Sequence, residues 1–543
     1  MRSRAVLLFA AATLLYLAVG LYLSLGVGYV QGDSLSRVAD TRSVLWSRDP
    51  HLAAIGFIFT PLTALAQLPA VWLSGWFPAL TRWGLTAVAV SAPAMAGAVL
   101  QVHAIARERG CPRWLTWGLT AVFALHPMIV YYGANGMSEA LFVFLVVWAV
   151  RRIARWISTD DVHELMVAGC ALGLAYLARY DALAASGTAT LLVAAVSWAR
   201  SRKPAVAILD GLVVAAPTAL AFVAWSATSW LITGSALAQF SSRYGNAAIL
   251  EQSGGGSAGG LEALAFSLAE VVVLAPALAL VGAVCVVLAV RRRDPEPLTL
   301  LILVAVLGFA GLTYLRGMTF PFLRFYICAV PLVVLCVVFL APRRGRMPAR
   351  RLGPRPVERG SDTIGRGALW PALALVVVAT GVPVSGAAML SPALSQEQHA
   401  LHAAVLPGLG YADADLRLEE EAIIASFDTE RRLAAHLDSL GLPEGSVLMD
   451  TVQGFGIVAS TQRPDRFVVP SDRDFVRILN DPAAHGVRFL LTVPNEGRGA
   501  SDALNLRYPT IFENGSQIAS LEMEVINSGH DRPAWRVYRV YGS

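Results

Sequence analysis

Long uncharged segments are the feature that most constrains how this chain can fold. Charged residues make up 15% of the 543 residues and hydrophobic residues 56%. Many apolar segments reach the length of about 20 residues that crosses a bilayer as an α-helix. The sequence therefore predicts a polytopic α-helical protein that is surrounded by membrane lipids.

The basic residues predict which side of the membrane each loop faces. Short arginine-rich loops lie in the cytoplasm by the positive-inside rule. The segment 52–78 is apolar, but Pro61 and Pro69 interrupt it, and each removes a helical N–H donor. If this segment crossed the membrane, the arginines within 107–113 would face outward. We therefore expect 52–78 to form broken interfacial or re-entrant helices that line a cavity.

About eleven spans remain, with the N-terminus in the cytoplasm and the C-terminus outside. The chain would thus be a multi-pass protein of the plasma membrane. The expected spans are about 5–25, 83–106, 114–132, 138–156, 164–179, 183–199, 205–232, 263–290, 297–315, 320–341 and 368–389.

The composition divides the chain into two predicted domains. Residues 1–390 form the transmembrane domain, with a first outer loop at 26–80 and a Pro-, Gly- and Arg-rich cytoplasmic linker at 342–367. Residues 391–543 form a small extracytoplasmic α/β domain, because helical and β-rich runs alternate there. Its expected helices are 414–440 and 472–480, and its expected strands are 446–450, 466–470, 488–493, 520–526 and 535–540.

The outer loop 29–51, YVQGDSLSRVADTRSVLWSRDPH, concentrates charge beside the first span. Asp33 and Asp40 are seven residues apart, so a continuous helix would place both on one face. Asp49 precedes Pro50 and could cap a helix. Asp49 and His51 could instead contact substrate or hold a divalent metal, Mg²⁺ or Mn²⁺, although this spacing is weak evidence for a metal.

Further polar residues occur at the outer ends of the expected spans. Asn135 and Glu139 could bind sugar hydroxyls, and Glu139 could equally cap a helix. Arg179 and Asp181 could contact substrate or form a mutually neutralised turn. Such a pair is costly at that depth unless it serves the fold or a cavity.

Five segments together resemble the GT-C superfamily of glycosyltransferases, in its bacterial, actinobacterial-like form. The resemblance rests on their order and topology over roughly residues 1–390. The segments are GDSLSR at 32–37, DPHLAAIGFIFTPL at 49–62, HPMIVYYGANGMSEALF at 126–142, LARYDALAA at 177–185 and FPFLRFYICAVPL at 320–332.

The resemblance implies a hexosyl- or pentosyltransferase that takes a sugar from a polyprenyl-phosphate donor. The acceptor would be a cell-envelope glycan or glycolipid outside the membrane, and the reaction a single inverting displacement. The family's first-loop aspartate corresponds to Asp33, which would act as the general base. A carboxylate that removes a proton from the attacking hydroxyl contributes roughly 10²–10⁴-fold to the rate.

Outward arginines are the candidates to bind the donor phosphate. Arg243 with Tyr244, Arg316 and Arg324 all reach the outer side, where topology disfavours positive charge. Arginine binds phosphate through a bidentate fork. The same residues could instead contact lipid headgroups.

Two other functions compete with the enzyme hypothesis. A transporter or flippase of lipid-linked sugars should show inverted repeats and paired broken helices. The sequence predicts one broken segment only, which favours an enzyme. A non-catalytic family member is the other alternative. Nucleic-acid binding is not expected despite the net charge of +5, because the arginines lie in loops between spans.

Overall fold

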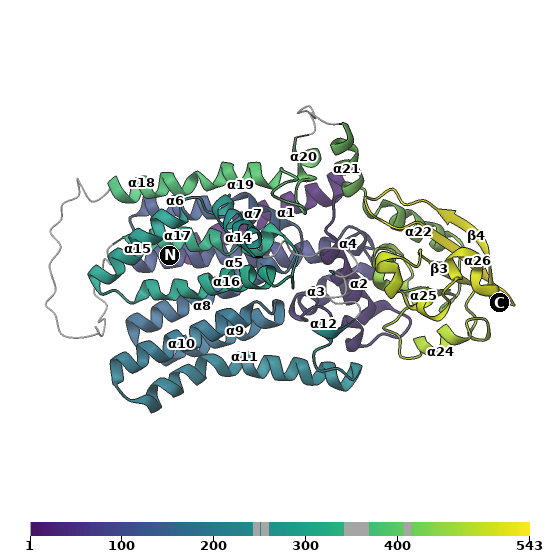
Figure 1. The fold of residues 1–543 in the computed structure, drawn as a ribbon, viewed down its shortest axis with the longest axis horizontal. Coiled ribbons are helices and arrows are strands. Elements are labelled where there is room, and N and C mark those ends of the chain that lie inside the picture. Colours follow the sequence, from purple (N-terminus) through teal and green to yellow (C-terminus); the bar gives the residue numbers. More distant parts are fainter. Residues whose placement is uncertain (1, 243–249, 251–259, 342–368, 407–413, 543) are drawn as a thin grey trace.

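The computed structural model describes residues 2–242, 250, 260–341, 369–406 and 414–542. A bundle of long helices and a smaller part that contains a β-sheet lie at opposite ends of the molecule, with short helices between them (Figure 1). The predicted fold class, a polytopic helical membrane protein with a small C-terminal α/β part, is confirmed. The predicted linker 342–367 lies outside the described residues.

Seven helices of the described residues are long and apolar enough to cross a membrane, and two bent helix pairs raise this number to as many as nine. The chain is therefore a multi-pass membrane protein. The single helices are α1 (Arg2–Leu21) with η1 (Tyr22–Val27), α5 (Leu85–Arg109), α10 (Ala182–Ser201), α11 (Pro204–Thr233), η4 (Glu296–Leu300) with α16 (Leu301–Leu315), η5 (Leu323–Tyr326) with α17 (Ala329–Leu340), and α18 (Leu369–Ala379) with α19 (Gly381–Met389).

The two bent pairs correct one expectation. Helices α6 (Arg113–Ala124) and α7 (Pro127–Ala134) meet at 58°, and α14 (Leu261–Leu274) and α15 (Leu278–Arg292) meet at 82°. A proline lies at each break, Pro127 and Pro276, and its missing N–H interrupts the helical hydrogen bonds. The expectation of only one broken segment is therefore wrong.

Two further helices occupy the remaining predicted spans. Helix α8 (Glu139–Thr159) contains three arginines, and α9 (Val162–Ala178) has 17 residues. Neither α8 nor α9 is among the helices whose length and composition are sufficient to cross a membrane. The count of about eleven spans therefore stays a prediction.

The segment after the first span forms several short helices, as expected for a broken region. It begins with α2 (Gly32–Trp46), which is followed by η2 (Leu52–Ile55), α3 (Leu62–Trp72), η3 (Leu73–Gly75) and α4 (Ala79–Arg82). Figure 1 shows α2, α3 and α4 between the helical bundle and the C-terminal domain. This position lets one helix, α2, contact both.

The C-terminal domain is built on a five-stranded sheet in the order β2-β1-β3-β5-β4. Strand β1 pairs in parallel with β2 and β3, whereas β5 pairs antiparallel with β3 and β4. All five predicted strands are present: β1 (Val447–Leu448), β2 (Phe467–Val468), β3 (Phe489–Thr492), β4 (Ala519–Val525) and β5 (Trp535–Val540). The helices of this part are α20 (Leu401–Val405), α21 (Ala414–Ile424), α22 (Asp428–Ser439), α23 (Thr451–Ser460), α24 (Phe475–Asn480), α25 (Ala503–Arg507) and α26 (Ile511–Asn514).

The expected continuous helix 414–440 is instead two helices, α21 and α22. The helix is interrupted just before Phe427, whose side chain is 2% exposed and packs in the core of the C-terminal domain. Its ring stacks edge-on against Phe455 at a centroid distance of 5.5 Å. Burial of this aromatic ring accounts for a break that helical periodicity alone does not show.

Helix α2 joins the bundle to the C-terminal domain. Its residues Leu35 and Val38 belong to the same hydrophobic core as Phe455 and Val458 of α23. Ion pairs add to this contact: Arg48 contacts Asp472 at 3.1 Å, and Arg473 contacts Asp49 at 2.9 Å. Any displacement of the C-terminal domain therefore acts directly on α2.

Candidate active site

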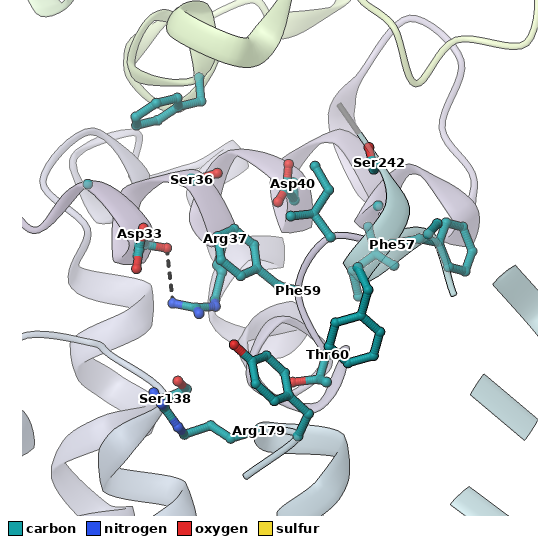
Figure 2. Close-up of a pocket in the computed structure, with 18 of the residues that line it drawn as sticks. Asp33, Ser36, Arg37, Asp40, Phe57, Phe59, Thr60, Ser138, Arg179 and Ser242 are labelled. Atoms are coloured by element: carbon teal, nitrogen blue, oxygen red, sulfur yellow. Dashed lines mark hydrogen bonds between the residues drawn. The ribbon is translucent and has the colours of Figure 1, made fainter. Parts of the chain in front are cut away.

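A cavity of about 1960 Å³ lies between α2, the helical bundle and the C-terminal domain. Figure 2 shows Asp33, Ser36, Arg37 and Asp40 of α2 on its wall, with Arg179 across from them. Further lining groups include residues of the segment 51–60, of the segments 178–183 and 232–242, of 309–325 and C-terminal positions such as Asp450, Arg498 and Arg532. Side chains of α2, of the helical bundle and of the C-terminal domain thus all line the cavity.

The polar residues of α2 face the cavity because they follow the helical period. Asp33, Arg37 and Asp40 are separated by four and three residues, so they share one face. The opposite face carries Leu35 and Val38, which are fully buried against the C-terminal domain. The predicted common face of Asp33 and Asp40 is confirmed.

Arg324 connects three carboxylates at this site. Its guanidinium lies 3.1 Å from Asp33 Oδ2, 3.1 Å from Glu397 Oε1 and 3.8 Å from Glu139 Oε1. Arg324 is 8% exposed, and its cation stacks over the rings of Phe322 and Phe325. Two of the predicted site residues, Asp33 and Arg324, are therefore in direct contact.

Arg179 extends this network along the wall. It pairs with Glu139 and, at 2.6 Å, with Asp181. Glu139 is 1% exposed, and two arginines, Arg179 and Arg324, contact its carboxylate. The structure brings together these predicted residues, and their roles toward a substrate stay predictions.

The carboxyl of Asp33 is held ionised. Desolvation opposes ionisation, but Arg324, Arg37 and Arg498 outweigh it and lower the pKa of Asp33 below its ordinary value. The side chain is 41% exposed, and it lines the cavity. Asp33 can therefore accept a proton or a hydrogen bond from a group that enters this space.

Two other carboxyl groups of the cavity, those of Asp40 and Glu397, have raised pKa values. Desolvation raises the pKa of Asp40 to about 8, with only partial compensation by Arg37. Desolvation also raises the pKa of Glu397 to about 7, although Arg324 opposes the shift. Carboxyls whose environments separate their pKa values are typical of acid–base sites.

Arg37 is a site residue that the sequence reasoning missed. It is 7% exposed, donates to the backbone carbonyl of Asp33 at 3.2 Å (dashed in Figure 2) and stacks over Phe59 at 4.1 Å. In the described part of the chain its guanidinium forms no ion pair within 4.0 Å. Its position four residues after Asp33 was an available signal, because i and i+4 share a helix face.

Several predicted residues lie elsewhere. Arg316 is exposed and does not line the cavity, and Arg243 and Tyr244 lie outside the described residues. Asn135 accepts a hydrogen bond from the N–H of Met137 and lies outside the main cavity.

Asp49 and His51 do not form a plausible metal site. Asp49 does not line the cavity; it pairs with Arg473 and lies 3.7 Å from His51 Nε2. His51 lines the cavity, and its Nδ1 atom accepts a hydrogen bond from the N–H of Ala54. The described residues contain no group of three or more His, Cys, Asp or Glu placed to hold a metal. Asp33 itself faces arginines, which repel a divalent cation. These residues therefore do not fit Mg²⁺ or Mn²⁺.

Comparison with known proteins supports the fold. No protein-family model matches the sequence, and no curated protein matches it. A similar solved structure is that of ArnT from Cupriavidus metallidurans bound to undecaprenyl phosphate, with 15% identity, a TM-score of 0.53 and coverage of 98% of this chain and 97% of that chain. Another is the archaeal oligosaccharyltransferase AglB from Archaeoglobus fulgidus in complex with an inhibitory peptide and a dolichol-phosphate, with 12% identity, coverage of 90% and 69%, and a TM-score of 0.42. The likeness to ArnT shows that this chain has the GT-C fold.

Proposed function

We propose that this protein is an inverting membrane glycosyltransferase that transfers a sugar from a polyprenyl-phosphate donor to a cell-envelope glycan or glycolipid. The observation that carries this proposal is the ionised carboxylate of Asp33 among arginines in a large cavity. The fold shared with ArnT, whose structure contains undecaprenyl phosphate, supports it. The sugar is a hexose or a pentose.

Asp33 acts as the general base. Its carboxylate takes the proton of the acceptor hydroxyl while the hydroxyl oxygen attacks the anomeric carbon. The bond from that carbon to the phosphate oxygen breaks in the same step, and the configuration at the carbon inverts. The bonding electrons leave with the phosphate, so the reaction needs no general acid for this leaving group.

Arg324 and Arg37 stabilise the departing phosphate. Both are buried at the cavity wall next to Asp33, and Arg37 makes no ion pair within 4.0 Å in the described part of the chain. Guanidinium groups that face a developing dianion stabilise the transition state more than the ground state. Arg316 takes no part in this proposal because it lies away from the cavity.

An apolar part of the same cavity fits the polyprenyl chain. Ile232 of α11 and Phe309 and Ala310 of α16 line it, together with Phe320 and Phe322 near η5. These residues continue from the charged region into the helical bundle. A lipid phosphate could therefore reach the arginines while its chain remains among apolar side chains.

The arrangement of charge supports an outward-facing site. Arg109 pairs with Glu296 at 2.7 Å, and Arg151 pairs with Glu108. Arg109 and Glu108 lie at the C-terminal end of α5. The opposite, N-terminal end of α5 follows α4, and α4 contacts α23 of the C-terminal domain. By the positive-inside rule the arginine-rich C-terminal end of α5 is cytoplasmic, which puts the N-terminus inside and the C-terminal domain outside.

A transporter of lipid-linked sugars is the competing function, and the bent pairs α6–α7 and α14–α15 favour it. The test uses the full-length protein in lipid nanodiscs with a synthetic polyprenyl-phosphate sugar and envelope acceptors. We expect free polyprenyl phosphate and a glycosylated acceptor with the opposite anomeric configuration. Movement of the donor with its sugar–phosphate bond intact would show a transporter instead.

Donor binding tests the arginine assignment separately. Arg37→Gln should weaken the binding of polyprenyl phosphate at least about tenfold, since it removes a charged hydrogen-bond donor. Arg316→Gln is the matched control, because that arginine is exposed and outside the cavity. Equal affinities for both variants and the wild type would place the phosphate elsewhere.

A further inference from the structure

Two arginines of the C-terminal domain face the cavity in which Asp33 lies. Arg498 belongs to η8 (Gly497–Ser501), and Arg532 lies in the connection between β4 and β5. The two are close enough to act on each other: Arg498 interacts electrostatically with Asp33 and with Arg532. Asp33 thus has Arg324 of the bundle on one side and an arginine of the C-terminal domain on another.

Neither of these arginines is neutralised by a carboxylate within 4.0 Å in the described part of the chain. By contrast, the third C-terminal arginine of the cavity wall, Arg473, is paired with Asp49. Arg498 is exposed to solvent and Arg532 is half-buried. The carboxylates that act on them lie farther away, Asp33 for Arg498 and Glu430 for Arg532, and desolvation outweighs them and lowers the pKa of both arginines. An anion between them would compensate two like charges at once.

Arg532 is fixed in place by its aromatic surroundings. Its guanidinium lies 4.5 Å from the ring centre of Phe427 and 5.8 Å from that of Phe455. One of its N–H groups donates weakly to Gln453 Oε1 at 3.5 Å, so most of its donors remain available. A fixed guanidinium loses little entropy when it binds an oxyanion.

The first turn of α2 adds to the positive potential here. A side chain on Gly32 would come within 3.6 Å of Arg532 Nη2, so the backbone of this turn lies next to the guanidinium. The N-cap residue Gln31 makes no capping hydrogen bond through its side chain. The partial positive charge of this helix end therefore adds to that of Arg532, although the carboxylate of Asp33 belongs to the same turn.

We propose that Arg498 and Arg532 form a subsite for an acidic group, a phosphate or carboxylate, of the acceptor. The proposal rests on the proposed function and names the acceptor class as an anionic glycan or glycolipid. The donor phosphate is held by Arg37 and Arg324 from α2 and the bundle, whereas this subsite comes from the C-terminal domain. An acceptor held here by its acidic group presents a neighbouring hydroxyl to Asp33, which lies between the two sets of arginines.

Binding of small anions tests the subsite without any turnover. The full-length protein in nanodiscs is first saturated with polyprenyl phosphate, and inorganic phosphate or glucuronate is then titrated by equilibrium dialysis. We expect the wild type to bind at least one of these probes. In Arg498→Gln/Arg532→Gln the affinity should fall at least tenfold. Arg539→Gln, which removes an exposed arginine paired with Glu522 on the sheet, should bind as the wild type does.

The outcomes separate this subsite from the donor site. If the double variant binds both probes as tightly as the wild type, or if the wild type binds neither, the subsite does not exist. If polyprenyl phosphate displaces the probes, the pair belongs to the donor site and the acceptor assignment is wrong. Arg498→Gln alone serves if the double variant does not fold, because Arg498 is an exposed residue.

Failure of the proposed function gives a different result. Asp33→Asn should keep the anion binding, since it removes none of the donors. In turnover assays Arg498→Gln should raise the KM for an acidic acceptor at least tenfold and leave the KM for the donor unchanged. A protein that binds anions through these arginines but never cleaves the donor would contradict the glycosyltransferase proposal and leave the subsite standing.

Discussion

Gly136 offers a sharp test of how the site is held together. This buried residue has a φ of +75°, and it lies in the turn between α7 and α8. A Cβ atom placed on it would overlap the Oγ atom of Ser34 and come within 2.5 Å of the Cβ atom of Ala87. Ser34 is the neighbour of Asp33, so Gly136→Ala should displace the first turn of α2.

The expected cost follows from two effects. A left-handed backbone costs an L-residue roughly 1–2 kcal/mol, and overpacking a dense core adds about 1–3 kcal/mol. The reduced entropy of the unfolded chain offsets about 0.4–1 kcal/mol of this. The free energy of unfolding should therefore fall by about 1–5 kcal/mol. With an unfolding entropy of about 2.1 cal/mol/K per residue, this corresponds to a fall in Tm of about 1–4 °C.

The assay is thermal unfolding of the purified protein in one detergent, combined with turnover at 25 °C. Gly187→Ala is the control, because that glycine lies within α10 and a Cβ atom there meets nothing within 4 Å. The control should be neutral or more stable by up to about 1 kcal/mol. Turnover of Gly136→Ala should fall by up to about 10²-fold, as expected for a displacement of about 1 Å. If Gly136→Ala matches the control in both measurements, the described packing of α2 is incorrect.

Two further predictions concern pH and the contact between domains. Burial raises the pKa of Asp40 from 3.8 to about 8, so the protonated form favours folding and stability is lost as pH rises through this window. The Tm of the wild type should therefore fall between pH 5 and pH 8.5 by more than that of Asp40→Asn, and equal falls would contradict the burial of this carboxyl. Arg48→Met leaves the fully buried side chain of Asp472 without its cation, which typically costs about 3–5 kcal/mol. Limited proteolysis should then release the C-terminal domain faster at pH 8 than at pH 5, where Asp472 becomes protonated; an unchanged rate would show that the pair does not hold the domains together.

The overall architecture could be predicted from the sequence because its signals are local. Apolar runs of bilayer length indicate spans, and the five β-rich runs each overlap an observed strand. The errors occur where tertiary packing decides the conformation. Pro276 divides what looks like one span, and the burial of Phe427 divides what looks like one helix.

The site could be predicted only in part. The family resemblance selects Asp33, outward charge and topology select Arg324, and the fold brings the two side chains within 3.1 Å of each other. Arg498 and Arg532 carry no local signal, because nothing near them in sequence indicates that the C-terminal domain reaches the cavity. Asp49 has the opposite character: it resembles a site residue in sequence, but its partner Arg473 lies in the other domain.

The most direct test of the account is the turnover of Asp33→Asn with a synthetic polyprenyl-phosphate sugar. The amide has the shape of the carboxylate but cannot take the proton of the acceptor hydroxyl. We expect the rate of sugar transfer to fall by about 10²–10⁴-fold, with polyprenyl phosphate still bound. Asp531→Asn, at a side chain that is 90% exposed, should turn over normally. Transfer by Asp33→Asn at the wild-type rate would contradict the central claim that Asp33 is the catalytic base.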